Sequence, residues 1–258
     1  MIYTKNDAEI DLMRKSGKLL HEVLEQLKPM VQPGVTTLEI DAAAEKLIRD
    51  AGAIPSCKGY EGFPYTICAS VDDEVVHGFP TATPLKEGQI VSIDTCLLLN
   101  GWQADSAFTS PVGTVSKEAK RLIKVTEQCF WKGAAQAKAG NRLGDIGSAI
   151  QQYAEAQGYG VIRDFCGHGI GREMHEDPSV PNYGNPGRGV RLTPGMTICI
   201  EPMIAQGTWK VYIKDNDWTA ITRDGKLCSH YEHTVLITEG EPELLTFPGA
   251  KVGGHAND

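Results

Sequence analysis

Apolar residues recur at helical spacing near the start of the chain. Between Asn6 and Leu27 they fall on one face of a 3.6-residue repeat, and Asn6 or Thr4 can cap the first turn. A second amphipathic stretch follows a Pro-Gly break and runs from Thr37 to about Arg49. Both stretches are therefore predicted to be α-helices.

Strand-forming residues follow these helices. Residues 65–80 and 89–115 are rich in β-branched and aromatic side chains, and Asn100-Gly101 is typical of a tight hairpin turn. The same order then recurs, with helices expected over 117–138 and 143–157 and strands from there to the end. Helices followed by strands, twice, predict an α+β fold with helices packed on one side of a bent antiparallel sheet.

An internal repeat strengthens this interpretation. Residues 85–94 resemble residues 192–201, and each stretch ends on a carboxylate, Asp94 and Glu201. A buried charge must be paired, protonated or bound to a metal, so the matched carboxylates point to a shared site. Further matches lie upstream: Gly34, Ile40, Ala43 and Gly52 with Gly140, Ile146, Ala149 and Gly158. The repeat predicts a fused pseudo-dimer, although two ordinary turn-plus-strand units would also produce it.

The domain organisation follows from this repeat. We expect residues 1–258 to form a single catalytic domain with pseudo-symmetric halves at about 5–115 and 116–248, and residues 249–258 to form a flexible tail. No Ser/Pro-rich linker separates the halves.

Composition restricts the partners and the compartment. The chain has 33 acidic and 25 basic residues, a formal charge of −8, which argues against a specific nucleic-acid partner. Its seven cysteines lack C-x-x-C spacing and lie mostly in apolar runs, as expected of reduced thiols in the cytoplasm. No signal-peptide core or apolar stretch of membrane-spanning length is present, so we expect no membrane association.

Several polar residues form a candidate metal site. Asp94 and Asp105 flank the Asn100-Gly101 turn, which is expected to bring the two side chains close together on neighbouring strands. His168, Glu201 and Glu232 follow in the second half. Two Asp, two Glu and one His suit a pair of divalent first-row ions, as in two-metal hydrolases. Each residue alone has a plainer interpretation, since acids near hairpins are common and a histidine among glycines is usually structural.

These motifs together resemble a known family. Residues 166–178, the Asp94/Asp105 spacing, residues 200–202 and residues 231–233 are similar to the type I methionine aminopeptidases over about residues 5–247. Members of that family are metallo-exopeptidases. The resemblance implies the pita-bread (creatinase/aminopeptidase) fold, a pseudo-twofold pair of halves with a curved antiparallel sheet and helices on its outer face.

The resemblance also implies roles for individual residues. Asp94, Asp105, His168, Glu201 and Glu232 would bind two divalent metal ions (Mn, Fe(II), Co or Zn), with Asp105 and Glu232 bridging. Metal-activated hydroxide would attack the scissile peptide, and Glu201 would carry the proton. His175 would hydrogen-bond the substrate carbonyl, and His77 would contact the scissile amide. The substrate pocket would be lined by Cys57, Tyr60, Phe63, Cys68, Met174 and Trp218. Met174 stands where many members carry an aromatic residue.

The implied function is removal of the initiator methionine from nascent polypeptides or peptides when the second residue is small, by a monomer. The alternative is a catalytically weakened pita-bread paralogue that acts as a binding module or on a different N-terminal residue. Lys210, Lys214, Arg223 and Lys226 could dock on a ribosome, but nearby acids nearly cancel their charge, and a solvated hairpin is favoured.

Overall fold

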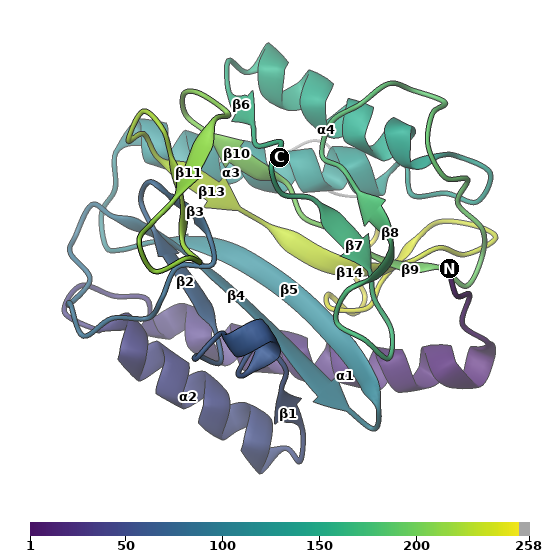
Figure 1. Cartoon of the computed structure of the whole chain (residues 1–258), viewed down its shortest axis with the longest axis horizontal. Coiled ribbons are helices and arrows are strands. Elements are labelled where there is room, and N and C mark those ends of the chain that lie inside the picture. Colours follow the sequence, from purple (N-terminus) through teal and green to yellow (C-terminus); the bar gives the residue numbers. More distant parts are fainter. Residues whose placement is uncertain (253–258) are drawn as a thin grey trace.

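The computed structural model describes residues 1–252. Figure 1 shows a central sheet with two helices along one edge of the view and two along the other. The helices are α1 (Asp7–Leu27), α2 (Thr37–Asp50), α3 (Lys117–Ala134) and α4 (Leu143–Ala156), with short 3-10 turns at Lys28–Met30 and Tyr60–Gly62. The strands are β1 (Ile54–Pro55), β2 (Cys68–Val71), β3 (Glu74–Val76), β4 (Ile90–Leu99), β5 (Trp102–Pro111), β6 (Gly160–Val161), β7 (Gly167–Gly169), β8 (Glu176–Val180), β9 (Thr197–Ile200), β10 (Met203–Ala205), β11 (Val211–Ile213), β12 (Ala220–Thr222), β13 (Cys228–His230), β14 (Glu232–Leu236) and β15 (Glu243–Leu244).

Helix α1 begins where the sequence predicts. The Asn6 side chain accepts a hydrogen bond from the Glu9 amide, and the Glu9 carboxylate accepts one from the Asn6 amide, forming a capping box. The third helix differs from its prediction, because it ends at Ala134 and not near residue 138. Beyond it, hydrogen bonds from the Gln136 and Ala137 amides reach carbonyls only three residues back, which tightens the chain into turns.

The main sheet joins the two halves of the chain. Its strands follow the order β1-β4-β5-β14-β9-β7-β8, with β2 paired to β4 and β15 to β14. The β4-β5 hairpin turns at Asn100 and Gly101, whose φ angles of 53° and 80° are those of a two-residue turn with both residues left-handed. The antiparallel pairing of β5 with β14 lies at the centre. The predicted bent α+β sheet is therefore confirmed.

Each half has its own apolar core beneath its helices. One core packs α1 and α2 against β4 and β5, through residues such as Leu20, Ile40 and Ile93. The other packs α3 and α4 against β9 and β14, through residues such as Phe130 and Ile198. Side chains that alternate with these along the strands point to the opposite face of the sheet, which leaves that face for polar groups.

The ends of the chain extend this architecture only slightly. Ala250 and Val252, in the stretch expected to form a tail, pack against the second core. The rest of that expected tail, residues 253–258, lies outside the described residues. Within residues 1–252, none of the helices is both long enough and apolar enough to cross a membrane.

Candidate metal centre and substrate pocket

One cavity of about 320 Å³ brings together all the residues that the sequence singled out. Its lining combines carboxylates and histidines with sulfur and aromatic side chains. Its walls include Cys57, Tyr60, Phe63, Cys68, His77, Asp94, Asp105, His168, Met174, His175, Glu201, Trp218 and Glu232.

The carboxylates project from neighbouring strands of the main sheet. Asp94 lies opposite Ala107 and Asp105 lies opposite Cys96, so the two acids are diagonal neighbours. The turn at Asn100-Gly101 brings the two acids close together on neighbouring strands, as expected, with a diagonal offset of two positions. The carboxylates still share one face of the sheet and lie close enough to interact.

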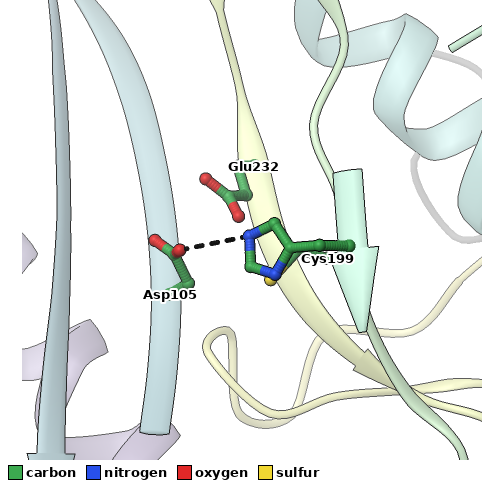
Figure 2. A group of neighbouring side chains, drawn as sticks. Asp105, Cys199 and Glu232 are labelled. Atoms are coloured by element: carbon green, nitrogen blue, oxygen red, sulfur yellow. Dashed lines mark ion pairs between the residues drawn. The ribbon is translucent and has the colours of Figure 1, made fainter. Parts of the chain in front are cut away.

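The central pairing of strands fixes the third carboxylate against Asp105. Glu232 lies opposite Ala107 at the start of β14. The hydroxyl of Thr234 donates to the Asp105 carbonyl at 2.9 Å, and the Asp105 amide donates to the same hydroxyl at 3.1 Å. Figure 2 shows Asp105 and Glu232 directed toward one another, with Cys199 beside them. The sheet therefore holds these groups in place without a contribution from flexible loops.

His168 enters the site between two glycines because the strand is packed closely on both sides. A Cβ at Gly167 would lie 2.2 Å from the Cys199 carbonyl oxygen, and one at Gly169 would lie 2.1 Å from the Asp177 carbonyl oxygen. The imidazole Nδ1 is 2.9 Å from the Gly169 carbonyl, which can only accept, so Nδ1 donates. Nε2 is thereby left to face Asp105 Oδ2 at 3.5 Å and Glu201 Oε1 at 3.6 Å.

Burial and mutual repulsion shift the ionisation of the carboxylates. Burial raises the pKa of Glu201 to about 8. Burial and then the charge of Asp105 raise the pKa values of Asp94 and Glu232 well above their usual range. Burial acts the same way on Asp105, but its pairing with His168 outweighs it and lowers its pKa. Burial opposes protonation of His168, yet the two neighbouring acids raise its pKa to about 8.

The donors fit divalent metal ions. Atoms of Asp105, His168, Cys199 and Glu232 lie within 4.8 Å of one another, and so do atoms of Glu201, His230 and Glu232. Among residues 1–252, Asp105 Oδ1 and Glu232 Oε1 are buried without a hydrogen-bond partner. Buried carboxylate oxygens without partners are costly unless they bind a cation. The Nδ1–H of His168 on a backbone carbonyl is also the usual support for a metal-binding imidazole.

The two accessory histidines lie at the edges of this polar group. The loop between β7 and β8 turns the chain so that the ring centroids of His168 and His175 are 4.3 Å apart. His175 Nδ1 is 2.8 Å from the Tyr60 hydroxyl. His77 has a left-handed backbone, with φ of 58°, and its ring lies edge-on to Phe165 and Trp218. Burial lowers the pKa values of both histidines, that of His77 to about 4.

The apolar end of the cavity combines sulfur and aromatic groups. Cys57, Phe63, Cys68, Cys96 and Met174 form one buried cluster, with Tyr60 and Trp218 packed against it. The Phe63 ring meets Trp218 edge-on at 5.1 Å. Such a lining suits an apolar side chain, and contacts between sulfur and aromatic rings are favourable.

Three residues of this region were not identified from the sequence. Each lies two positions from one of the predicted acids: Cys96 follows Asp94, Cys199 precedes Glu201 and His230 precedes Glu232. Residues two apart on an extended chain share a face, so the alternation around each acid could have revealed them. Asp94, in contrast, lines the cavity but belongs to neither of the two donor groups.

Known proteins resemble this chain along nearly its whole length. Residues 11–239 match the model of metallopeptidase family M24. The chain is 54% identical to a methionine aminopeptidase of Clostridium perfringens, over 95% of this chain and 99% of that protein. It is 47% identical to methionine aminopeptidase 1 of Bacillus subtilis, with the same coverage. The crystal structure of methionine aminopeptidase from Rickettsia prowazekii superposes with a TM-score of 0.94 at 41% identity, covering 95% of this chain and 100% of that one.

Proposed function

The chain belongs to metallopeptidase family M24, and we propose that it is a type I methionine aminopeptidase that removes N-terminal methionine from peptides and proteins. It is a metal-dependent hydrolase with the pita-bread fold. The observation that carries the proposal is the cavity itself, where an acidic group of metal donors adjoins a pocket of sulfur and aromatic side chains. The first part suits peptide hydrolysis, and the second suits a methionine side chain.

The metal ions would be held by Asp94, Asp105, His168, Glu201 and Glu232, with Asp105 and Glu232 shared. The proposal includes two ions per chain, drawn from Mn, Fe(II), Co and Zn. Such ions, when bound, lower the pKa of water and polarise the substrate carbonyl. The partnerless oxygens of Asp105 and Glu232 support this assignment.

The remaining steps are assigned to side chains of the cavity. Glu201 would take a proton from the attacking water and deliver it to the leaving amine. His175 would donate a hydrogen bond to the substrate carbonyl as negative charge develops there, with its ring held by the Tyr60 hydroxyl. His77 would contact the scissile amide. Substrate methionine would lie among Cys57, Tyr60, Phe63, Cys68, Met174 and Trp218.

Finer parts of the proposal concern substrate range and setting. We expect cleavage when the second residue is small, in the cytoplasm, by a monomer, since one chain supplies every residue of the cavity. Docking at the ribosome would involve the segment around β11. It would be contradicted if Lys210→Glu with Lys214→Glu left co-sedimentation with ribosomes unchanged. A catalytically weakened paralogue would be expected to have lost metal ligands. All five expected metal ligands line the cavity, which disfavours that alternative.

The experiment that tests the proposal measures free methionine released from Met-Gly-Met-Met and Met-Leu-Met-Met. Metal-stripped protein would be titrated with manganese, cobalt, iron(II) or zinc, beside Glu201→Ala. We expect metal-dependent cleavage of the first peptide only, and its loss in the variant. Folded protein that cleaves neither peptide with any of these metals would contradict the proposal.

A further inference from the structure

Among residues 1–252, His230 is a buried histidine whose Nε2 atom makes no hydrogen bond. The residue is 1% exposed, at the end of β13, and within residues 1–252 its Nε2 has no hydrogen-bond partner. Nε2 lies 3.9 Å from Glu201 Oε2 and 3.9 Å from Glu232 Oε2. Both distances are too long for hydrogen bonds.

The backbone around His230 fixes this position. The Thr109 hydroxyl donates to the His230 carbonyl at 2.8 Å and accepts from the His230 amide at 3.0 Å. Strand β13 also pairs with β10, with His230 opposite Met203. These contacts hold the backbone of His230, and from there its ring reaches two carboxylates, those of Glu201 and Glu232.

A single divalent ion would account for all three groups. Zinc-type ions bind imidazole nitrogen and carboxylate oxygen at about 2.0–2.2 Å, so two donors to one ion lie roughly 3–4 Å apart. Atoms of Glu201, His230 and Glu232 all lie within 4.8 Å of one another. Neutral imidazole is also the commonest metal ligand among side chains.

We propose that His230 Nε2 is a metal ligand of this enzyme, alongside Glu201 and Glu232 and in addition to the five residues assigned above. The site would then contain two imidazoles, one from His168 and one from His230, each in a donor group that includes Glu232. Nitrogen donors favour later first-row ions over magnesium or calcium, so His230 would shift metal preference in that direction. This inference rests on the proposed metal site but not on the identity of the peptide substrate.

The test is metal binding, measured without substrate. Metal-stripped wild type, His230→Gln and the control His21→Gln would be titrated with Mn²⁺, and free Mn²⁺ would be followed by electron paramagnetic resonance. His21 lies beyond the other face of the sheet, stacked on Phe247. We expect His230→Gln to weaken one binding step by about 10–100-fold, with no change in the control. Pulsed resonance on the bound Mn²⁺ should show weaker ¹⁴N modulation in His230→Gln.

Three outcomes separate this inference from the proposed function. Affinity within twofold of wild type, with unchanged ¹⁴N modulation, would overturn the role of His230 alone. Wild type that binds no Mn²⁺ would overturn the proposed metal site as well. If His230→Gln fails to fold, His168→Gln is measured in its place. Remaining ¹⁴N modulation in His168→Gln would support a second imidazole ligand. Complete loss of the modulation would reject a second imidazole ligand.

Discussion

Replacing Lys5 with methionine would remove one partner of a buried ion pair beside the site. Lys5 Nζ lies 2.8 Å from Glu176 Oε2, and the two side chains are 2% and 18% exposed. The other oxygen of Glu176 accepts hydrogen bonds from the Arg172 and Glu173 amides. The pair therefore ties the N-terminal segment to the loop that carries Met174 and His175.

The expected cost follows from this geometry. Breaking a buried ion pair from one side costs about 3–5 kcal/mol, because the remaining charge is left uncompensated. Glu176 keeps two backbone donors and some access to water, so we expect a smaller loss of about 2–3 kcal/mol in Lys5→Met. At about 2–4 °C per kcal/mol for a chain of this size, the melting temperature should fall by roughly 4–12 °C.

The assay is urea or thermal unfolding of metal-stripped protein, with Lys138→Met as the matched control. Lys138 pairs with Glu241 at 2.6 Å, but these side chains are 42% and 64% exposed, so its loss should cost below about 1 kcal/mol. Adding Glu176→Gln to Lys5→Met should recover part of the stability, since it removes the unpaired charge. An equal loss of stability in Lys5→Met and Lys138→Met would show that the buried ion pair contributes no more than an exposed one.

Three further predictions concern other parts of the molecule. Gly167→Ala should lower the free energy of unfolding by about 3 kcal/mol, because its Cβ would overlap the Cys199 carbonyl, whereas Gly240→Ala, with nothing nearer than 3.9 Å, should be nearly neutral in the same urea titration. Burial raises the pKa of Asp41 in the folded state, so its ionisation opposes folding as pH rises, and Asp41→Asn should gain stability relative to wild type as the pH rises above about 4, the usual pKa of an Asp side chain; an equal pH slope in both proteins would contradict this. Metal at about 1,000 times its dissociation constant should stabilise the protein by about 4 kcal/mol, measured as a higher melting temperature that a chelator reverses.

Helix starts and the sheet could be predicted from the sequence because local chemistry decides them. Asn6 caps α1 and Asn100-Gly101 turns the hairpin, since each side chain or backbone preference acts within a few residues. The end of α3 could not be predicted in this way. Residues 135–138 are good helix formers, and the tightened turns at Gln136 and Ala137 depend on how the following chain packs.

The site was predictable as a set of residue types but not as a geometry. Acids such as Asp94 and Glu201 stand out in apolar strands, because such positions are costly for charges. His230 lies two positions before Glu232, which places it on the same face of the chain, but this spacing does not place its ring against two carboxylates. Only the pairing of β13 with β10 and the contacts of Thr109 place its ring.

The pairing of β5 with β14 determines when during synthesis the protein can first bind metal and cleave peptides. Asp105 lies on β5, and Glu232 lies on β14, which leaves the ribosome much later than β5. A nascent chain that has emerged only to β13 contains the residues of the first core, but it lacks Glu232, which both donor groups share. Activity should therefore arise abruptly as β14 adds to the sheet, and stalled chains that end before Glu232 should neither retain metal nor cleave peptides.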